Sequence, residues 1–174
     1  MNILELLEPV NTFVFDVDGV LTDGTVYLYP GGEMLRAMNI KDGYALQLAI
    51  KHGYEVVIIS GGLSDLVKER LEKLGIRHVF MKTTDKLTVL SEFAAAKATK
   101  WNQMLFMGDD LPDAEVMEQP GIVACCPADA AVEIRAISHY ISPLNGGYGC
   151  VRDIIEKVMR LHGKWQHIEA VASR

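Results

Sequence analysis

Short runs of consecutive apolar, partly β-branched residues recur along the chain, and longer amphipathic segments separate them. The runs lie at 13–18, 55–60, 78–80, 104–109, 122–126 and 139–142. Because a parallel strand is covered on both faces, its residues are apolar in succession, so these runs predict buried parallel strands. Apolar residues at helical spacing predict helices at 42–53, 64–75, 85–98, 112–119 and 148–163. Strands that alternate with helices predict an α/β fold with three layers around a doubly wound parallel sheet.

One segment interrupts this alternation. Residues 25–39, TVYLYPGGEMLRAMN, contain two β-prone stretches around a Pro-Gly-Gly turn, which predicts a small protruding β-hairpin. The C-terminal tail, residues 164–174, is weakly patterned, so we expect it to be loosely ordered or to contact a neighbouring subunit. We expect residues 1–174 to form a single domain, because no repeat or linker divides them.

The composition narrows the classes of partner. Of the 174 residues, 49% are hydrophobic and 23% are charged, which is typical of a globular protein. The formal net charge of -6 argues against a nucleic-acid partner, because binding to the phosphate backbone requires a surplus of Lys and Arg. A small phosphorylated substrate remains compatible with this charge, since one bound dication can reverse the local field.

The N-terminus and the cysteines favour a cytoplasmic protein. The opening MNILELLEPVNTF lacks the basic start and long apolar stretch of a signal peptide. No run approaches the ~18 apolar residues of a membrane span, so we expect no membrane contact. Cys125, Cys126 and Cys150 form no CxxC pair and no zinc-binding spacing, and we expect them to be reduced.

Polar side chains follow the predicted strands at the points where these end. Ligands of open α/β sheets bind at the carboxyl ends of the strands, so these side chains should converge on one edge. Several carboxylates repel one another at close range unless a cation lies among them. Oxygen-only ligands suit Mg²⁺, which typically takes one or two carboxylates together with a substrate phosphate. The converging residues are Asp16, Asp18, Ser60, Lys86, Asp109, Asp110 and Asp113.

The Asp-x-Asp spacing of the first strand has a chemical meaning. Asp16 can present a carboxylate oxygen to phosphorus, while Asp18 can act as a general acid and then activate water. Ser60 and the backbone N–H of Gly61 can hold phosphoryl oxygens, and Lys86 can offset the charge on the nucleophile and the phosphate. The set therefore predicts hydrolysis of a phosphate ester.

The chain resembles the haloacid dehalogenase superfamily, whose four motifs match DVDGVLTD (16–23), IISGG (58–62), Lys86 and GDDLPD (108–113) in the usual order. The resemblance implies a Rossmann-like core in which Asp16 is the nucleophile and Asp18 the acid and base. It implies a Mg²⁺ ion held by the Asp16 carboxylate, the Asp18 backbone carbonyl and Asp109. Asp113, and with it Asp110, would hold these ligands in place without binding the ion.

Most members of this superfamily carry a cap domain over the substrate. The intervals between Asp16 and Ser60 and between Ser60 and Lys86 are too short for one, so we expect no cap domain and an open site. An apolar hairpin is only marginally stable alone, and the 25–39 hairpin should therefore seek a partner. The resemblance to capless members, which are tetramers, implies a homotetramer in which the C-terminal segment reaches a neighbouring site.

Within this superfamily the chain is most similar to the capless group that acts on octulosonate and nonulosonate phosphates, both small sugar-acid phosphates. Gly62 and Leu63 stand where octulosonate phosphatases usually carry Arg and Lys, so the choice of sugar acid stays open. Arg70 and Arg152 are candidates for contact with the substrate carboxylate, and Lys41 for the entrance. The similarity rests on residues 18–24, 40–46, 70–75, 108–117 and 145–153.

Other functions compete with this hypothesis. A different sugar phosphate, or a mutase reaction, would use the same residues, although mutases generally need a cap. A receiver-type signalling module also combines an acceptor Asp, Mg²⁺, a hydroxyl and a Lys on a parallel sheet. Asp18 favours a phosphatase, because an acid and base beside the acyl phosphate shortens its lifetime. A silent interaction protein is disfavoured by the intact set of reactive residues.

Overall fold

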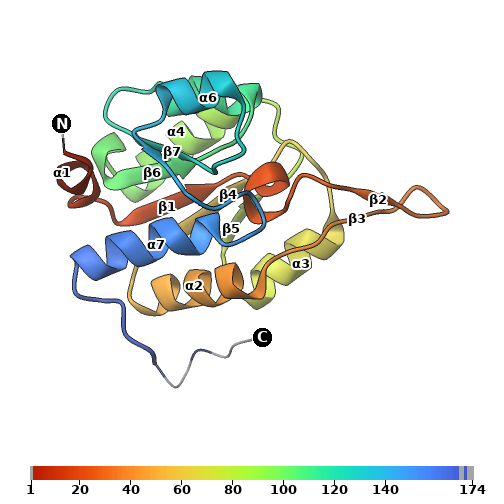
Figure 1. Cartoon of the computed structure of the whole chain (residues 1–174), viewed down its shortest axis with the longest axis horizontal. Coiled ribbons are helices and arrows are strands. Elements are labelled where there is room, and N and C mark those ends of the chain that lie inside the picture. Colours follow the sequence, from red (N-terminus) through yellow and green to blue (C-terminus); the bar gives the residue numbers. More distant parts are fainter. Residues whose placement is uncertain (1, 169–170, 172–174) are drawn as a thin grey trace.

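The computed structural model describes residues 2–168 and 171, and these form a six-stranded parallel sheet between two layers of helices (Figure 1). The strand order is β5-β4-β1-β6-β7-β8, so β1 lies between β4 and β6. This confirms the predicted three-layer α/β fold. The strands are β1 (Thr12–Phe15), β4 (Glu55–Ile59), β5 (His78–Phe80), β6 (Met104–Met107), β7 (Val123–Cys126) and β8 (Tyr140–Ile141).

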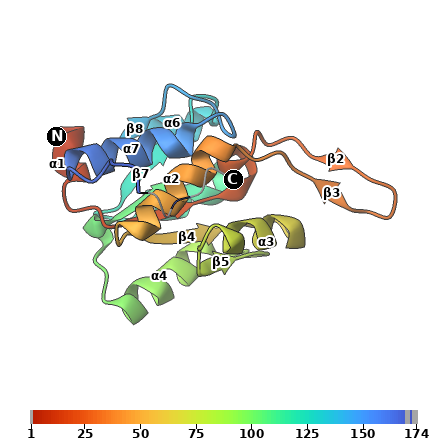
Figure 2. The same cartoon turned by 90° about the horizontal axis from the view of Figure 1, so that it is seen from below.

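Helices lie on both faces of the sheet (Figure 2), and each face carries its own hydrophobic core. Along β1, Phe13 and Phe15 belong to one core and Val14 to the other, which explains why these three successive residues are all apolar. One core is covered by α2 (Ile40–Lys51), α3 (Asp65–Lys73), α7 (Cys150–Leu161) and the short α1 (Ile3–Leu7). The other is covered by α4 (Lys86–Lys97), α5 (Ala114–Met117) and α6 (Val132–Ile137).

The predicted elements differ from the observed ones mainly at their ends. β1 stops at Phe15 rather than at residue 18, because the chain enters an irregular turn over Val17–Leu21. β6 likewise ends at Met107, two residues before its predicted end. The sequence analysis missed α1 and α6, which are too short to establish a helical period.

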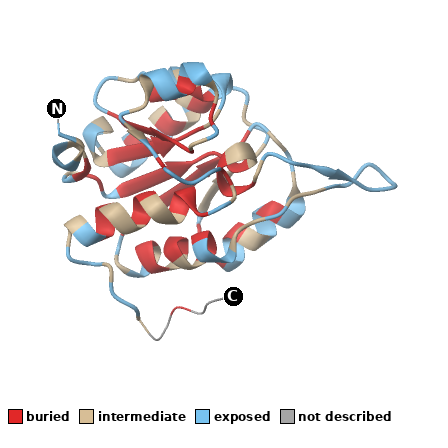
Figure 3. Cartoon of the chain, viewed as in Figure 1, coloured by how far each residue is buried: buried red, intermediate tan, exposed pale blue. Residues whose placement is uncertain are grey.

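The predicted hairpin is present and projects from the body of the molecule (Figures 1 and 3). Its strands are only two residues each, β2 (Tyr27–Leu28) and β3 (Met34–Leu35). Leu28 is 79% exposed, and Tyr27 and Tyr29 are each 60% exposed, so the hairpin presents apolar side chains to solvent. Between Asp16 and Ser60 the structure contains only this hairpin, α2 and β4 besides connecting segments, which agrees with the absence of an inserted cap.

The start of α7 is held by a buried carboxylate. Asp42 is 1% exposed, and its Oδ1 accepts a hydrogen bond of 2.7 Å from the backbone N–H of Arg152. Burial raises the pKa of Asp42 to about 6, and its Oδ2 has no hydrogen-bond partner within the described part of the chain. This contact ties α2 to α7, and so fixes the glycine-rich segment 145–149 that leads into α7.

The described part of the tail lies on its own chain. Trp165 and Ile168 pack against the core under α2 and α7, and the hydroxyl of Tyr44 lies 2.7 Å from Nδ1 of His167. We predicted that the tail, residues 164–174, reaches a neighbouring site. Part of this segment lies outside the described residues. In the described ranges, no helix combines the length and the apolar character needed to cross a bilayer.

Candidate active site

Three parallel strands end at the same level: β1 is followed by Asp16, β4 by Ser60, and β6 by Gly108 and then Asp109. Phe15 at the end of β1 pairs with Ile58 of β4 on one side and with Met107 of β6 on the other. The next residues along the chain bring Asp16, Ser60 and Asp109 to one edge of the sheet. A cavity of about 360 Å³ opens there. It is lined by Asp16, Asp18, Gly19, Gly24, Ser60, Gly61, Gly62, Thr83, Thr84, Lys86, Asp109, Asp110, Pro112 and Asp113.

The turn after β1 depends on glycine. Gly19 has φ +86°, and a Cβ atom there would collide with the carboxylate of Asp109. From the other side the loop is packed against the segment before α7, where a Cβ atom on Gly146 would collide with the carbonyl oxygen of Gly19. The hydroxyl of Thr22 accepts a hydrogen bond of 3.3 Å from the N–H of Gly19. The turn is therefore enclosed from both sides, which restricts the positions of Asp16 and Asp18.

Lys86 joins two of the carboxylates. Its Nζ lies 2.9 Å from Oδ1 of Asp16 and 2.7 Å from Oδ1 of Asp113, and its side chain is only 6% exposed. Burial acts to lower the pKa of Lys86, but the charges of Asp16 and Asp113 outweigh it, so the pKa is raised. Lys86 begins α4, and the preceding Asp85 caps that helix through the N–H of Thr88. Asp85 thus fixes the start of α4, where Lys86 lines the cavity.

The remaining acids are crowded together. Burial, followed by the charge of Asp113, raises the pKa of Asp16 to about 6 against the opposing effect of Lys86. Burial and the neighbouring carboxylates, Asp16 foremost, raise the pKa of Asp109 to about 7. Lys86 therefore does not neutralise the cluster by itself, and a cation bound between Asp16 and Asp109 would stabilise their charged forms.

The donor set fits a hard dication. Carboxylate oxygens of Asp16, Asp109 and Asp113 lie within 4.8 Å of one another. Asp113 is already engaged, since its Oδ1 meets Lys86 and its Oδ2 accepts from the backbone N–H of Asp109 at 3.0 Å. Among the described residues no N–H or O–H group donates to the Asp109 carboxylate, which leaves it free for a metal. Oxygen donors of this number suit Mg²⁺.

Asp110 and Asp113 shape the loop after β6. Asp110 caps a short 3₁₀ turn over Leu111–Asp113 through a 2.8 Å hydrogen bond from the N–H of Leu111, and it also lines the cavity. Asp113 is 1% exposed and receives the backbone N–H groups of Asp109 and Asp110. Their contacts agree with the expected supporting role, which stays a prediction for both.

The opposite wall offers neutral hydrogen-bond donors. Ser60 is 1% exposed, and its Oγ accepts a hydrogen bond of 3.1 Å from the N–H of Gly62. Its backbone carbonyl accepts from the N–H of Thr83 at 2.9 Å, which draws the loop after β5 up to the cavity. Thr83 and Thr84 were missed by the sequence analysis. Their position just before a helix N-cap at a strand end is the signal that could have identified them.

Arg36 was also missed, and no local pattern identifies it. It follows β3 at the base of the hairpin, and its guanidinium meets the carboxylate of Asp18 through Nε at 2.6 Å and Nη2 at 3.2 Å. Arg36 and Arg70 line a separate cavity of about 340 Å³ between the hairpin and α3. The guanidinium of Arg70 has neither a hydrogen bond nor an ion pair within the described ranges.

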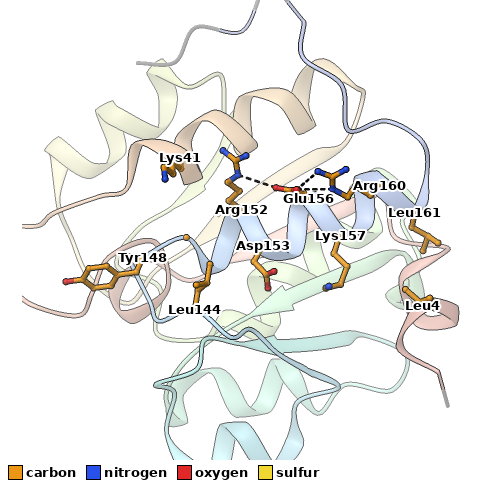
Figure 4. A pocket seen from close by; sticks show the side chains of 11 residues that line it. Leu4, Lys41, Leu144, Tyr148, Arg152, Asp153, Glu156, Lys157, Arg160 and Leu161 are labelled. Atoms are coloured by element: carbon orange, nitrogen blue, oxygen red, sulfur yellow. Dashed lines mark hydrogen bonds and ion pairs between the residues drawn. The ribbon is translucent and has the colours of Figure 1, made fainter.

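The structure does not bring Arg152 and Lys41 to the cavity of Asp16. Both line a broad groove along α7, together with Tyr148 (Figure 4). The side chain of Arg152 pairs with Glu156 at 3.3 Å and lies over the ring of Trp165. Substrate contact by these two residues stays a prediction, and within one chain the structure offers it no support.

Comparison with known proteins places these features in context. No family model matches the chain. It is 34% identical over 163 residues to 3-deoxy-D-manno-octulosonate 8-phosphate phosphatase KdsC of Escherichia coli K12, covering 94% of this chain and 86% of the relative. The crystal structure of 3-deoxy-D-manno-octulosonate 8-phosphate phosphatase from Yersinia pestis superposes with a TM-score of 0.89 at 33% identity, covering 92% of this chain and 86% of that one.

A second solved structure carries ligands. The 3-deoxy-D-manno-octulosonate 8-phosphate phosphatase of Moraxella catarrhalis, in complex with a magnesium ion, a phosphate ion and a KDO molecule, superposes with a TM-score of 0.87. It is 31% identical to this chain, and the match covers 91% of each.

Proposed function

The chain belongs to the 3-deoxy-D-manno-octulosonate 8-phosphate phosphatase family of the haloacid dehalogenase superfamily, and on this basis we propose that it hydrolyses 3-deoxy-D-manno-octulosonate 8-phosphate with Mg²⁺. A nonulosonate 9-phosphate is the alternative substrate. The observation that carries the proposal is the cavity in which Asp16 lies beside Lys86, Asp109 and Asp18. A signalling module is disfavoured, because the relatives are phosphatases.

In the first step an Asp16 carboxylate oxygen attacks phosphorus, and the bond to the sugar oxygen breaks. Asp18 donates a proton to that leaving oxygen, which departs as a hydroxyl group. Lys86 holds Oδ1 of Asp16 at 2.9 Å, so the carboxylate is oriented before the substrate arrives. Ser60 accepts from the N–H of Gly62, which leaves its own hydrogen available to a phosphoryl oxygen.

In the second step water attacks the phosphorus of the aspartyl phosphate. Asp18 removes a proton from this water, the bond between phosphorus and the Asp16 oxygen breaks, and inorganic phosphate leaves. Asp18 thus ends each turnover protonated, ready to donate again. The position of Asp18 at the cavity wall, where it is partly exposed, supports both transfers.

The Asp16 and Asp109 carboxylates, with the backbone carbonyl of Asp18, would hold the Mg²⁺ ion. When bound, the ion supplies positive charge next to the phosphoryl oxygens and screens the two acids from each other. Asp113 keeps the loop of Asp109 in place through the backbone N–H of that residue. Lys86 contacts both Asp16 and Asp113, and so links the nucleophile to the loop after β6.

The second cavity supports a sugar acid as the leaving group. Arg36 lines it and contacts Asp18, which lines the catalytic cavity, so the two cavities adjoin at this pair. Arg70 offers a guanidinium without a partner among the described residues, which suits a carboxylate. Gly62 and Leu63 provide no charged side chain near the second cavity, so Arg70 would be the cation that binds the substrate carboxylate.

A panel of sugar phosphates tests the substrate. We expect kcat/KM for octulosonate 8-phosphate and nonulosonate 9-phosphate to exceed that for glucose 6-phosphate by ~10- to 100-fold, the worth of one charge-assisted contact. Arg70→Gln should remove this preference while leaving glucose 6-phosphate hydrolysis unchanged. Equal rates on acidic and neutral sugars would contradict a sugar-acid substrate, and no hydrolysis of any phosphate ester would contradict the function itself.

We propose further that the protein is a homotetramer, assembled through the hairpin. A two-stranded ribbon is marginally stable alone, and its exposed apolar side chains would be buried by copies of the same ribbon. The hairpin projects away from the body, so neighbouring copies can reach it (Figure 3). A neighbouring subunit would then cover the catalytic cavity, which has no cap domain from the subunit that contains it.

Sedimentation at micromolar concentration checks this assembly, and we expect the mass of four chains. Leu28→Asp should shift the protein to smaller species, because it places a charge in the proposed interface. Val132→Asp is the matched control, since Val132 is 76% exposed on α6 and should leave the mass unchanged. A wild-type monomer, or a tetramer unaffected by Leu28→Asp, would argue against assembly through the hairpin.

A further inference from the structure

Arg36 is a buried charge with one anionic partner. Its side chain is only 5% exposed, whereas that of Asp18 is 38% exposed. Nε and Nη2 of Arg36 donate to the two oxygens of Asp18, and Nη1 donates to the carbonyl oxygen of Met34 at 3.2 Å. Removing a guanidinium from water is costly unless its donors are satisfied by an ion pair and hydrogen bonds. The burial of Arg36 therefore depends on Asp18 staying where it is.

The fork geometry constrains the carboxylate more tightly than a single bond would. A guanidinium that meets both oxygens of a carboxylate fixes the plane of that carboxylate as well as its distance. Asp18 sits on the turn after β1, 18 positions before Arg36 in the chain, so the contact links the hairpin base to the catalytic loop. Asp18 receives no other hydrogen bond to its side chain from the described residues.

Arg36 acts from outside the catalytic cavity. It is absent from the lining of that cavity, although Asp18 and Gly62 are part of it. A Cβ atom on Gly62 would lie 3.0 Å from Oδ2 of Asp18 and 3.5 Å from Nη2 of Arg36. The absence of a side chain at Gly62 thus gives the pair its room, and Oδ2 lies next to a residue that lines the cavity.

We propose that Arg36 is a positioning residue for proton transfer by Asp18, an inference that rests on the proposed phosphatase function. The shorter bond, from Nε to Oδ1 at 2.6 Å, anchors the carboxylate. The longer bond, from Nη2 to Oδ2 at 3.2 Å, is the one that yields when Oδ2 exchanges a proton with the leaving oxygen or with water. Arg36 itself does not line the cavity in which the phosphoryl group is transferred, so it acts on that step through Asp18.

The test is a double-mutant cycle on kcat with Arg36→Met, Asp18→Asn and the combined variant. Methionine keeps the length and apolar packing of the stem, and Asp18, whose side chain is 38% exposed, stays in contact with water when its partner is removed. We expect Arg36→Met to lower kcat by ~10- to 100-fold, within the ~10²- to 10⁴-fold typical of general acid–base catalysis, with KM nearly unchanged. The combined variant should be no slower than Asp18→Asn, because Arg36 acts through Asp18.

Two further variants separate positioning from mere support of the fold. Arg36→Lys should recover part of kcat, since one charge-assisted hydrogen bond can re-form. Arg77→Met removes an exposed arginine away from the cavity and should leave kcat unchanged. Thermal melting establishes that each variant is folded, and if Arg36→Met is not, Arg36→Gln takes its place in the cycle.

The outcomes are distinct. Multiplicative losses in the combined variant, or no rescue by lysine, would overturn the positioning role. A raised KM at unchanged kcat would mean that Arg36 binds substrate instead, and a raised kcat would mean that it restrains Asp18. If the wild type is active and Arg36→Met is equally active, only this inference is contradicted. If the wild type has no phosphatase activity, the proposed function is contradicted, and this inference with it.

Discussion

Replacing Asp16 with asparagine should abolish phosphatase turnover while the fold stays intact. The amide is nearly isosteric with the carboxylate but is a poor nucleophile toward phosphorus, so no aspartyl phosphate forms. Loss of a covalent nucleophile lowers kcat by at least ~10⁴-fold in well-studied hydrolases, and we expect a loss of that order. Lys86 keeps its 2.7 Å contact with Asp113, so the substitution leaves no buried charge without a partner.

The measurement is steady-state hydrolysis, supported by mass spectrometry of acid-quenched protein. Wild-type protein mixed with substrate should carry one additional phosphoryl group on the peptide of Asp16, and Asp16→Asn should carry none. Asp65→Asn, an exposed acid in the first turn of α3, removes the same charge elsewhere and should retain full activity. Activity that survives in Asp16→Asn would eliminate the nucleophile assignment.

Removal of divalent metal should also stop the enzyme, and Mg²⁺ should restore it. The observation behind this expectation is the neighbouring pair Asp16 and Asp109. Burial and the charge of Asp113 raise the pKa of Asp16 to about 6, and burial and the charge of Asp16 raise the pKa of Asp109 to about 7. A dication between them relieves both effects. After dialysis against EDTA we expect activity to fall to background, with full recovery on addition of excess Mg²⁺.

A second readout does not depend on activity. Mg²⁺ at ~100 times its Kd should stabilise the folded protein by about 2.7 kcal/mol, which raises Tm by roughly 5 to 10 °C. Asp109→Asn removes one carboxylate and should lose most of this shift, whereas Asp65→Asn should keep it. If EDTA affects neither activity nor Tm, the metal site is wrong.

The alternation of apolar runs and amphipathic segments was enough to predict the α/β fold and the hairpin. It could do so because strand and helix periods are local properties of the chain. The same logic located Asp16, Ser60 and Asp109, since each lies near the carboxyl end of a predicted strand, and parallel strands end at one edge. Element ends were predicted less well. β1 stops at Phe15 because the following turn is enclosed by Asp109 and Gly146, which lie far away in the sequence.

Contacts between side chains distant in the sequence were decided only by the tertiary structure. Arg36 reaches Asp18 because the base of the hairpin lies beside the catalytic loop, where Thr22 bridges to Met38. Asp42 meets the start of α7 because α2 packs along that helix. The angle at which two elements pack sets which side chains meet, and no local period records that angle. Arg152 and Lys41 illustrate this limit, since their motifs suggested the site but packing placed them along a different groove.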